Sequence, residues 1–169
     1  MGLEDKAIIT AALTGVAANR AQCPAIPYTP EEIAEEARRA RDAGAAVVHI
    51  HARDDDGGPS FEKARYREIR DRVRERCEGD IILNFSTGAI GIPMEERVDY
   101  IRDLGPEMGA LNMGSMNYAK YSSKNKTFYF DVVFENPFSD IMFLLEEMEK
   151  GNVKPELECF DIGHIGNIR

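Results

Sequence analysis

The sequence lacks the features of a nucleic-acid-binding, disulfide-stabilised or membrane-spanning protein. Its 21 lysines and arginines are outnumbered by 30 acids, giving a net charge of −9, so it has no basic footprint for nucleic acid or an anionic membrane. The three cysteines (Cys23, Cys77, Cys159) are widely spaced and form no CxxC pair, which is typical of free thiols in a reducing cytoplasm. No apolar run approaches the ~20 residues that span a bilayer, and we find no signal-peptide pattern.

The length bounds the architecture. With 169 residues, 43% of them hydrophobic, the chain suits one domain with a buried core, and we expect residues 1–169 to form a single domain. The same length falls well short of the ~250 residues typical of a complete (β/α)₈ barrel.

Short apolar runs alternate with amphipathic helical stretches, the pattern of βαβ units around a parallel sheet. We expect strands at 7–13, 45–52, 80–86, 109–113 and 156–161. We expect helices at 30–43, at 61–77 with Ser60 as a cap, at 94–104 and at 139–150. The first helix carries a capping box, with Thr29 as N-cap and Glu32 three residues later. Residues 128–134 fit either an extra strand or an ordered loop.

Each expected strand carries polar residues late in its run, although buried parallel strands are usually apolar throughout. They are Thr14 after the first strand, His49 and His51, Asn84 and Ser86, Asn112, and Glu156 with Glu158. The carboxyl ends of parallel strands carry the active sites of α/β proteins, so this pattern favours one shared site. The alternative is that these residues are simply strand ends that enter loops.

His49-Ile50-His51 is the most specific feature. Because strand side chains alternate, both imidazoles share one face, and two neighbouring neutral imidazoles can hold one divalent metal. Zinc is our first expectation, completed by a carboxylate and leaving one position open. Glu156 and Glu158 are candidates for that carboxylate, but hydrogen-bonding or acid/base roles fit them equally.

Two strand-end turns, Ser86-Thr87-Gly88-Ala89 and Asn112-Met113-Gly114-Ser115, are rich in hydroxyl and amide groups. Their glycines let backbone N–H groups approach an anion closely. Neither turn matches a nucleotide-binding fingerprint, so each alone is a weak signal.

Six stretches together resemble the β-keto acid cleavage enzymes, in the order of that family and over nearly the whole chain. They are TAALTG (10–15), NRAQCPAIPYTPEEIAEEA (19–37), DAGAAVVHIHARDDDGGPS (42–60), NFSTGA (84–89), PEMGALNMGSMN (106–117) and KPELECFDIGH (154–164). The resemblance implies a TIM barrel that binds Zn²⁺ and forms homo-oligomers, with this chain supplying about the first five strands and four helices. It also implies a retro-Claisen exchange in which a β-keto acid and acetyl-CoA give acetoacetate and a new acyl-CoA.

The resemblance also implies roles for single residues. His49 and His51 match the two histidine zinc ligands of the family, and Ser86 matches the serine that contacts the keto acid. We therefore expect Ser86 and Glu158 to be catalytic. The substrate contacts that we expect come from Thr14, Asn84, Ser86, Thr87, Gly88 and Asn112.

The chain departs from the family pattern at three places. Ala17 stands where the founding member has a glutamate for an amino-bearing substrate, so a cationic substrate side chain is not expected. Ala110 replaces a hydroxyl residue. The family's third zinc ligand, a glutamate, and its catalytic aspartate and arginine lie on later strands, beyond Arg169. We therefore expect a continuation of the gene, a second polypeptide or self-association to complete the barrel.

Two other functions stay open. A metal-dependent hydrolase of the amidohydrolase type also uses a strand His-x-His, although usually on its first strand. A truncated relic would act as a binding module or be inactive. For the leading reading, the expected partners are a β-keto acid, acetyl-CoA and further protein copies or a completing fragment, in the cytoplasm, without nucleic acid or membrane.

Overall fold

The computed structural model describes residues 6–169, and five parallel strands form its main sheet in chain order. The strands are β1 (Thr10–Ala12), β2 (Val47–Ile50), β3 (Ile82–Phe85), β4 (Met108–Asn112) and β7 (Lys154–Glu158). The order β1-β2-β3-β4-β7 never reverses, whereas a doubly wound sheet reverses at a switch point. Because parallel crossovers are right-handed, this order places the connecting helices on one side, as in a barrel wall.

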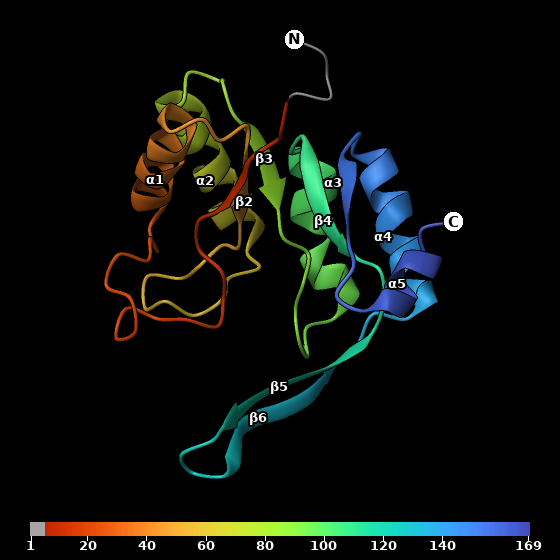
Figure 1. Cartoon of the computed structure of the whole chain (residues 1–169). Coiled ribbons are helices and arrows are strands. Elements are labelled where there is room, and N and C mark those ends of the chain that lie inside the picture. Colours follow the sequence, from red (N-terminus) through yellow and green to blue (C-terminus); the bar gives the residue numbers. More distant parts are fainter. Residues whose placement is uncertain (1–5) are drawn as a thin grey trace.

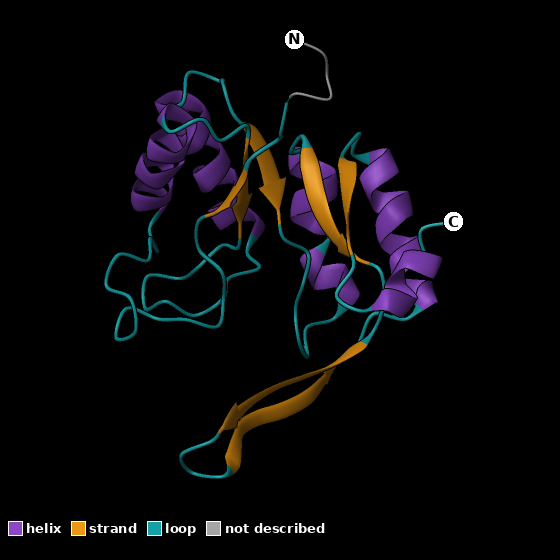
Figure 2. Cartoon of the chain, viewed as in Figure 1, coloured by secondary structure: helices purple, strands orange, loops and turns teal. Residues whose placement is uncertain are grey.

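Helices connect successive strands and form the outer layer (Figure 1, Figure 2). The connecting elements are α1 (Pro30–Asp42), α2 (Lys63–Arg76), the 3₁₀ turn η2 (Met94–Arg97), α3 (Asp99–Leu104) and α4 (Phe138–Lys150), and the short α5 (Ile162–Gly166) follows β7. The core lies between this layer and the sheet. Val48 and Ile50 of β2 are fully buried in it, and the intervening His49 therefore faces the opposite side.

The start of α1 confirms the capping box. The Thr29 hydroxyl accepts a hydrogen bond from the Glu32 N–H, and the Glu32 carboxylate accepts one from the Thr29 N–H. The predicted cap of α2 is wrong. That helix begins at Lys63 after Glu62, whereas Ser60 uses its N–H to bond Ala52 and is buried in the loop.

Three other boundaries differ from the prediction. Residues 94–104 are not one helix, because Val98 separates η2 from α3. The first strand is shorter than predicted and begins at Thr10. The last strand is shifted toward the N-terminus, to 154–158, because the following chain turns into α5, whose N-cap is Asp161.

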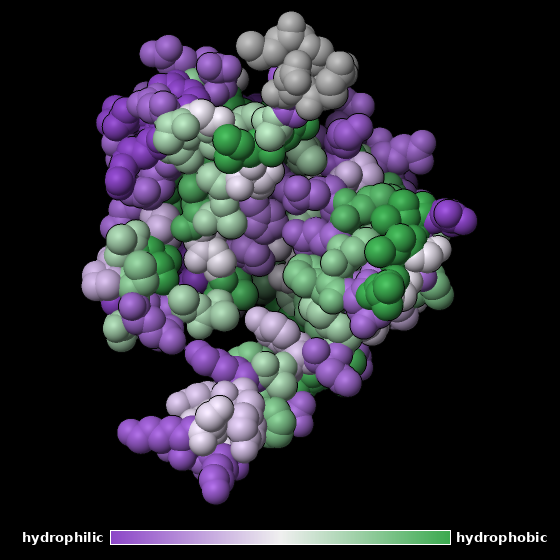
Figure 3. Space-filling view, viewed as in Figure 1, coloured by the Kyte–Doolittle hydropathy of each residue, from purple (hydrophilic) through white to green (hydrophobic). Residues whose placement is uncertain are grey.

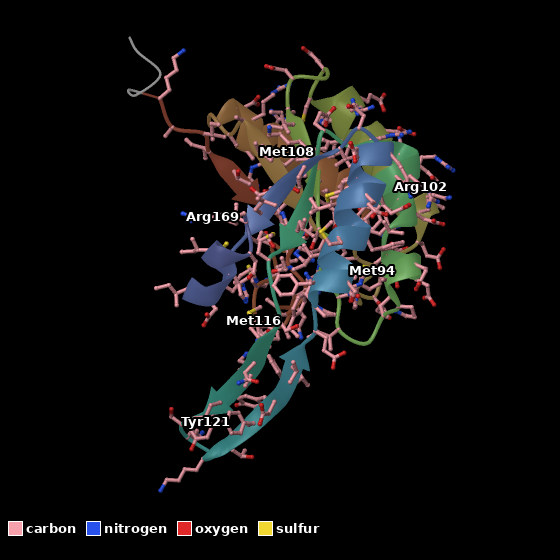
Figure 4. All side chains as sticks on the ribbon, turned by 90° about the vertical axis from the view of Figure 1, so that its right-hand side faces the viewer. Met94, Arg102, Met108, Met116, Tyr121 and Arg169 are labelled. Carbon is pink, nitrogen blue, oxygen red and sulfur yellow. The ribbon has the colours of Figure 1, made fainter. Side chains whose placement is uncertain are left out.

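The uncertain region forms an antiparallel hairpin. Strand β6 (Thr127–Phe134) confirms the strand alternative for 128–134, and its partner β5 (Met116–Ser122) was not predicted. Figure 4 shows the hairpin projecting from the sheet, with Met116 at its base and Tyr121 near its tip.

Apolar residues are unevenly distributed over the surface. In Figure 3, hydrophilic residues cover α1 and α2, and hydrophobic residues gather over α5. Phe160, Ile162 and Ile165 are each more than half exposed there. Across residues 6–169, no helix combines the length and apolar character needed to cross a membrane.

Candidate active site

A cavity of about 830 Å³ opens at the carboxyl ends of the strands. Its polar lining includes His49, His51, Ser86, Asn112, Glu156 and Glu158, which lie on β2, β4 and β7 or directly after β2 and β3. Apolar side chains, among them Val16, Phe61 and Ile90, form much of the remaining wall. The base of the hairpin adds Met116, Tyr118 and Phe134. The strand-end pattern therefore does converge on one space.

His49 on β2 and His51 directly after it lie side by side. Their ring centroids are 5.0 Å apart and the rings meet edge to face, at 66°. Burial lowers the pKa of His49, against an opposing effect of Glu156. Burial also lowers the pKa of His51 to about 4, with further contributions from His49 and Arg53. Both rings are therefore neutral at pH 7, the form that binds a metal.

Two acids of β7 face His49. Ligand atoms of His49, Glu156 and Glu158 all lie within 4.8 Å of one another. His51 is not part of this group. The His-x-His pattern treats the two histidines alike, whereas the structure places only His49 beside both acids. Burial, and then the charge of Glu156, raise the pKa of Glu158 to about 7.

Ser86 is fixed by its backbone. The Tyr100 hydroxyl donates to the Ser86 carbonyl at 2.7 Å, and Tyr100 stacks on Tyr66 with 3.7 Å between ring centroids. The Ser86 hydroxyl accepts the N–H of Gly88 at 3.3 Å and keeps its own proton for another partner. The sequence analysis missed this contact, because nothing in the spacing of Tyr66 and Tyr100 indicates that they stack on each other or bond the chain after β3.

The predicted substrate-contacting residues divide into two groups. Ser86, Gly88 and Asn112 line the cavity, whereas Thr14, Asn84 and Thr87 do not. The latter three are buried behind the wall and support it. The Thr14 hydroxyl accepts the N–H of His51 at 2.8 Å, the Thr87 hydroxyl donates to the Ala110 carbonyl, and the Asn84 amide donates to Glu156.

Arg53 is a residue near the site to which the sequence analysis assigned no role. It is 1% exposed, and its guanidinium donates to the carbonyls of Gly15, Ala18 and Gly57 at 2.7–2.9 Å. It thereby ties the loop after β1 to the loop after β2. An arginine directly after a strand was the available signal, but its acceptors are backbone groups that no sequence pattern reveals.

The donor set fits a divalent metal. Two neutral imidazoles and two carboxyl groups line the same cavity. Both are ligand types that zinc takes in proteins. The side-chain oxygen of Asn112 is buried in the cavity wall and has no hydrogen-bond partner in the described chain. Such an orphaned acceptor is expected where a ligand or water completes the site.

Comparison with known proteins gives relatives for this chain. A family model described as beta-keto acid cleavage enzyme matches residues 6–169. A 3-keto-5-aminohexanoate cleavage enzyme of Acetoanaerobium sticklandii is 40% identical, covering 93% of this chain and 54% of that enzyme. A 3,5-dioxohexanoate:acetyl-CoA acetone transferase of Paraburkholderia graminis is 35% identical, covering 99% of this chain and 58% of that enzyme. The chain thus spans about half the length of these curated relatives.

The fold has solved counterparts as well. A binary complex of ObcA with oxaloacetate matches with a TM-score of 0.69 and 26% identity, covering 85% of this chain and 33% of that chain. The five strands and their helices are therefore part of a TIM barrel, as predicted. The sequence match and the barrel wall agree: the chain belongs to the β-keto acid cleavage enzyme family.

Proposed function

We propose that this chain carries the zinc-binding half of the active site of an enzyme that exchanges acyl groups between a β-keto acid and acetyl-CoA. The products would be acetoacetate and a new acyl-CoA. The observation that carries the proposal is the cavity in which His49, His51, Ser86 and Glu158 meet, in a chain of this family. Relatives named as a cleavage enzyme and as an acetyl-CoA acetone transferase support the reaction class.

We assign zinc binding to His49 and His51. Their lowered pKa values support this, because neutral rings need no deprotonation before they bind. When bound, zinc would act as a Lewis acid that polarises the β-keto carbonyl. The mostly apolar cavity would exclude water that could hydrolyse the thioester.

The residues of the chain would bind and orient the substrate. Ser86 can donate its hydroxyl proton to the substrate carboxylate, and the unpartnered Oδ1 of Asn112 can accept a hydrogen bond from a donor group of the substrate or from a bound water. Glu158 lines the same cavity and would serve as the acid/base group for proton transfer. The apolar walls at Val16 and Ile90 favour a keto acid with an uncharged tail.

The test is a coupled assay of the purified protein with acetyl-CoA and a panel of β-keto acids, together with zinc quantification and intact mass. We expect acetoacetate formation, and we expect His49→Asn and Ser86→Ala to lower kcat/KM at least ~100-fold, a loss of about 2.7 kcal/mol in transition-state stabilisation. Glu149→Gln, at an exposed position of α4, is the matched control. Hydrolysis of lactones or amides without any CoA-dependent exchange would instead support an amidohydrolase-type function, and zinc-free protein without turnover would support a relic.

We also propose association with another protein copy or a completing fragment, in a reducing compartment such as the cytoplasm. Exposed apolar residues on α5 support the first part. The three unpaired cysteines support the second.

A further inference from the structure

Glu156 stands between a buried amide and a metal-ligand candidate. One carboxylate oxygen, Oε2, accepts a hydrogen bond from Asn84 Nδ2 and lies 3.9 Å from Nδ1 of His49. Asn84 is fully buried and is the register partner of His49 on the neighbouring strand. The amide therefore fixes the carboxylate on the Nδ1 side of the imidazole ring.

This placement matters because an imidazole has two nitrogens that cannot play the same role. A metal-bound histidine commonly donates the N–H of its other nitrogen to a carboxylate, which fixes both the tautomer and the ring orientation. The distance of 3.9 Å exceeds an N–H···O hydrogen bond by about 1 Å. A small side-chain rotation closes such a gap, and bonds of this kind often tighten only in the loaded site.

We propose that Glu156 is a positioning residue that holds His49 as the Nδ1–H tautomer and thereby presents Nε2 to the metal. The metal-binding part of this inference rests on the proposed function, whereas the tautomer is a property of the metal-free chain. Asn84 contributes to the same positioning, because its amide holds the Glu156 oxygen in place by a hydrogen bond. Glu158 has a different role, since within 4.0 Å only Glu156 of the two acids pairs with His49 in the described chain.

The tautomer can be measured directly. Long-range ¹H–¹⁵N correlation spectra of the metal-free protein, labelled at its three histidines and recorded above the pKa of His49, distinguish Nδ1–H from Nε2–H. We expect the Nδ1–H form at His49, a shift toward Nε2–H in Glu156→Ala and in Asn84→Ala, and partial rescue by Glu156→Gln, whose amide oxygen still accepts. Glu158→Ala is the matched control and should leave His49 in the Nδ1–H form, because Glu158 makes no pair with His49 within 4.0 Å in the described chain. A His49 in the Nε2–H form in the unmodified protein, or one that ignores Glu156→Ala, overturns the proposal.

Zinc titration provides the second measurement. Glu156→Ala should weaken zinc affinity by about 10–100-fold, with Glu156→Gln in between and the melting temperature of each variant as a folding control. If both substitutions abolish zinc binding while the tautomer is unchanged, Glu156 is itself a ligand and the positioning role is wrong. If the tautomer responds as expected but the protein has no acyl-exchange activity, the proposed function is wrong and the positioning of His49 by Glu156 is still supported.

Discussion

Arg53 is a buried cation whose side chain makes no ion pair in the described chain, and its partners are backbone carbonyls from two strand-end loops. Its guanidinium also lies 5.0 Å from the ring centroid of Tyr28, which adds a cation–π contact. The planar fork of an arginine can reach several acceptors at once, which an ammonium group on a flexible stem cannot. The loops that border the cavity therefore depend on one side chain.

We predict that Arg53→Lys lowers the free energy of unfolding by about 1.5–3 kcal/mol, because at least one buried carbonyl loses its charged donor. Urea denaturation followed by circular dichroism measures the loss. Arg67→Lys, at an exposed position on α2, should stay within about 0.5 kcal/mol of the parent protein. Equal stability of the two variants would show that Arg53 does not tie the loops together.

Because of the stacked pair Tyr66 and Tyr100, we predict that the stability of the fold decreases at alkaline pH. Burial raises the pKa of Tyr66 to about 12 and that of Tyr100 well above its ordinary value, whereas an unfolded tyrosine titrates near ~10. The folded state holds these two protons more tightly, so stability is unaffected below pH ~10 and falls as the pH rises toward 12. In a titration followed at 295 nm, two of the six tyrosines should ionise only when circular dichroism shows unfolding. Ionisation of all six in folded protein would contradict this.

Local sequence signals predicted some helices and strands better than others. The start of α1 follows from residues within one turn, because its cap, acidic first turn and N1 proline are all local. The break at Val98 and the strand β5 were missed. The hairpin pairs residues that are mostly exposed and of mixed polarity, such as Asn117 with Val133, so it has no clear alternation to read.

The capping box of α1 can be tested on its own. Thr29→Ala removes the side-chain acceptor of the Glu32 N–H and should cost about 1 kcal/mol of stability. Thr29→Ser retains an acceptor and should restore most of that loss. If urea denaturation shows equal midpoints for all three proteins, the Thr29 hydroxyl does not stabilise this helix.

On the scale of the whole molecule, apolar side chains of α5 are exposed to solvent. Ile162 is 86% exposed and Ile165 is 58% exposed on α5, next to Phe160 at the cavity. Contiguous apolar surface of this kind marks an interaction site. In a barrel, the wall beyond β7 would cover such residues.

We therefore expect the 169-residue chain to self-associate in a concentration-dependent manner in sedimentation velocity experiments. The double variant Ile162→Glu/Ile165→Glu should shift the population toward monomer, because burying two carboxylates in an apolar interface is unfavourable. Lys124→Glu, on the hairpin turn, is a control that adds negative charge elsewhere. A parent chain that is monomeric at every concentration would contradict the expectation.

The sequence by itself determined the strand–helix alternation, the strands that carry polar ends, and the family, because these depend on local periodicity and on motifs in fixed order. Only the tertiary structure decided that Thr14, Asn84 and Thr87 stand behind the cavity wall and that Glu156 faces Nδ1 of His49. Strand alternation gives the face on which a side chain lies, but not its depth or its partner. Those follow from the register between strands that lie up to 72 residues apart in the chain, where no local pattern operates.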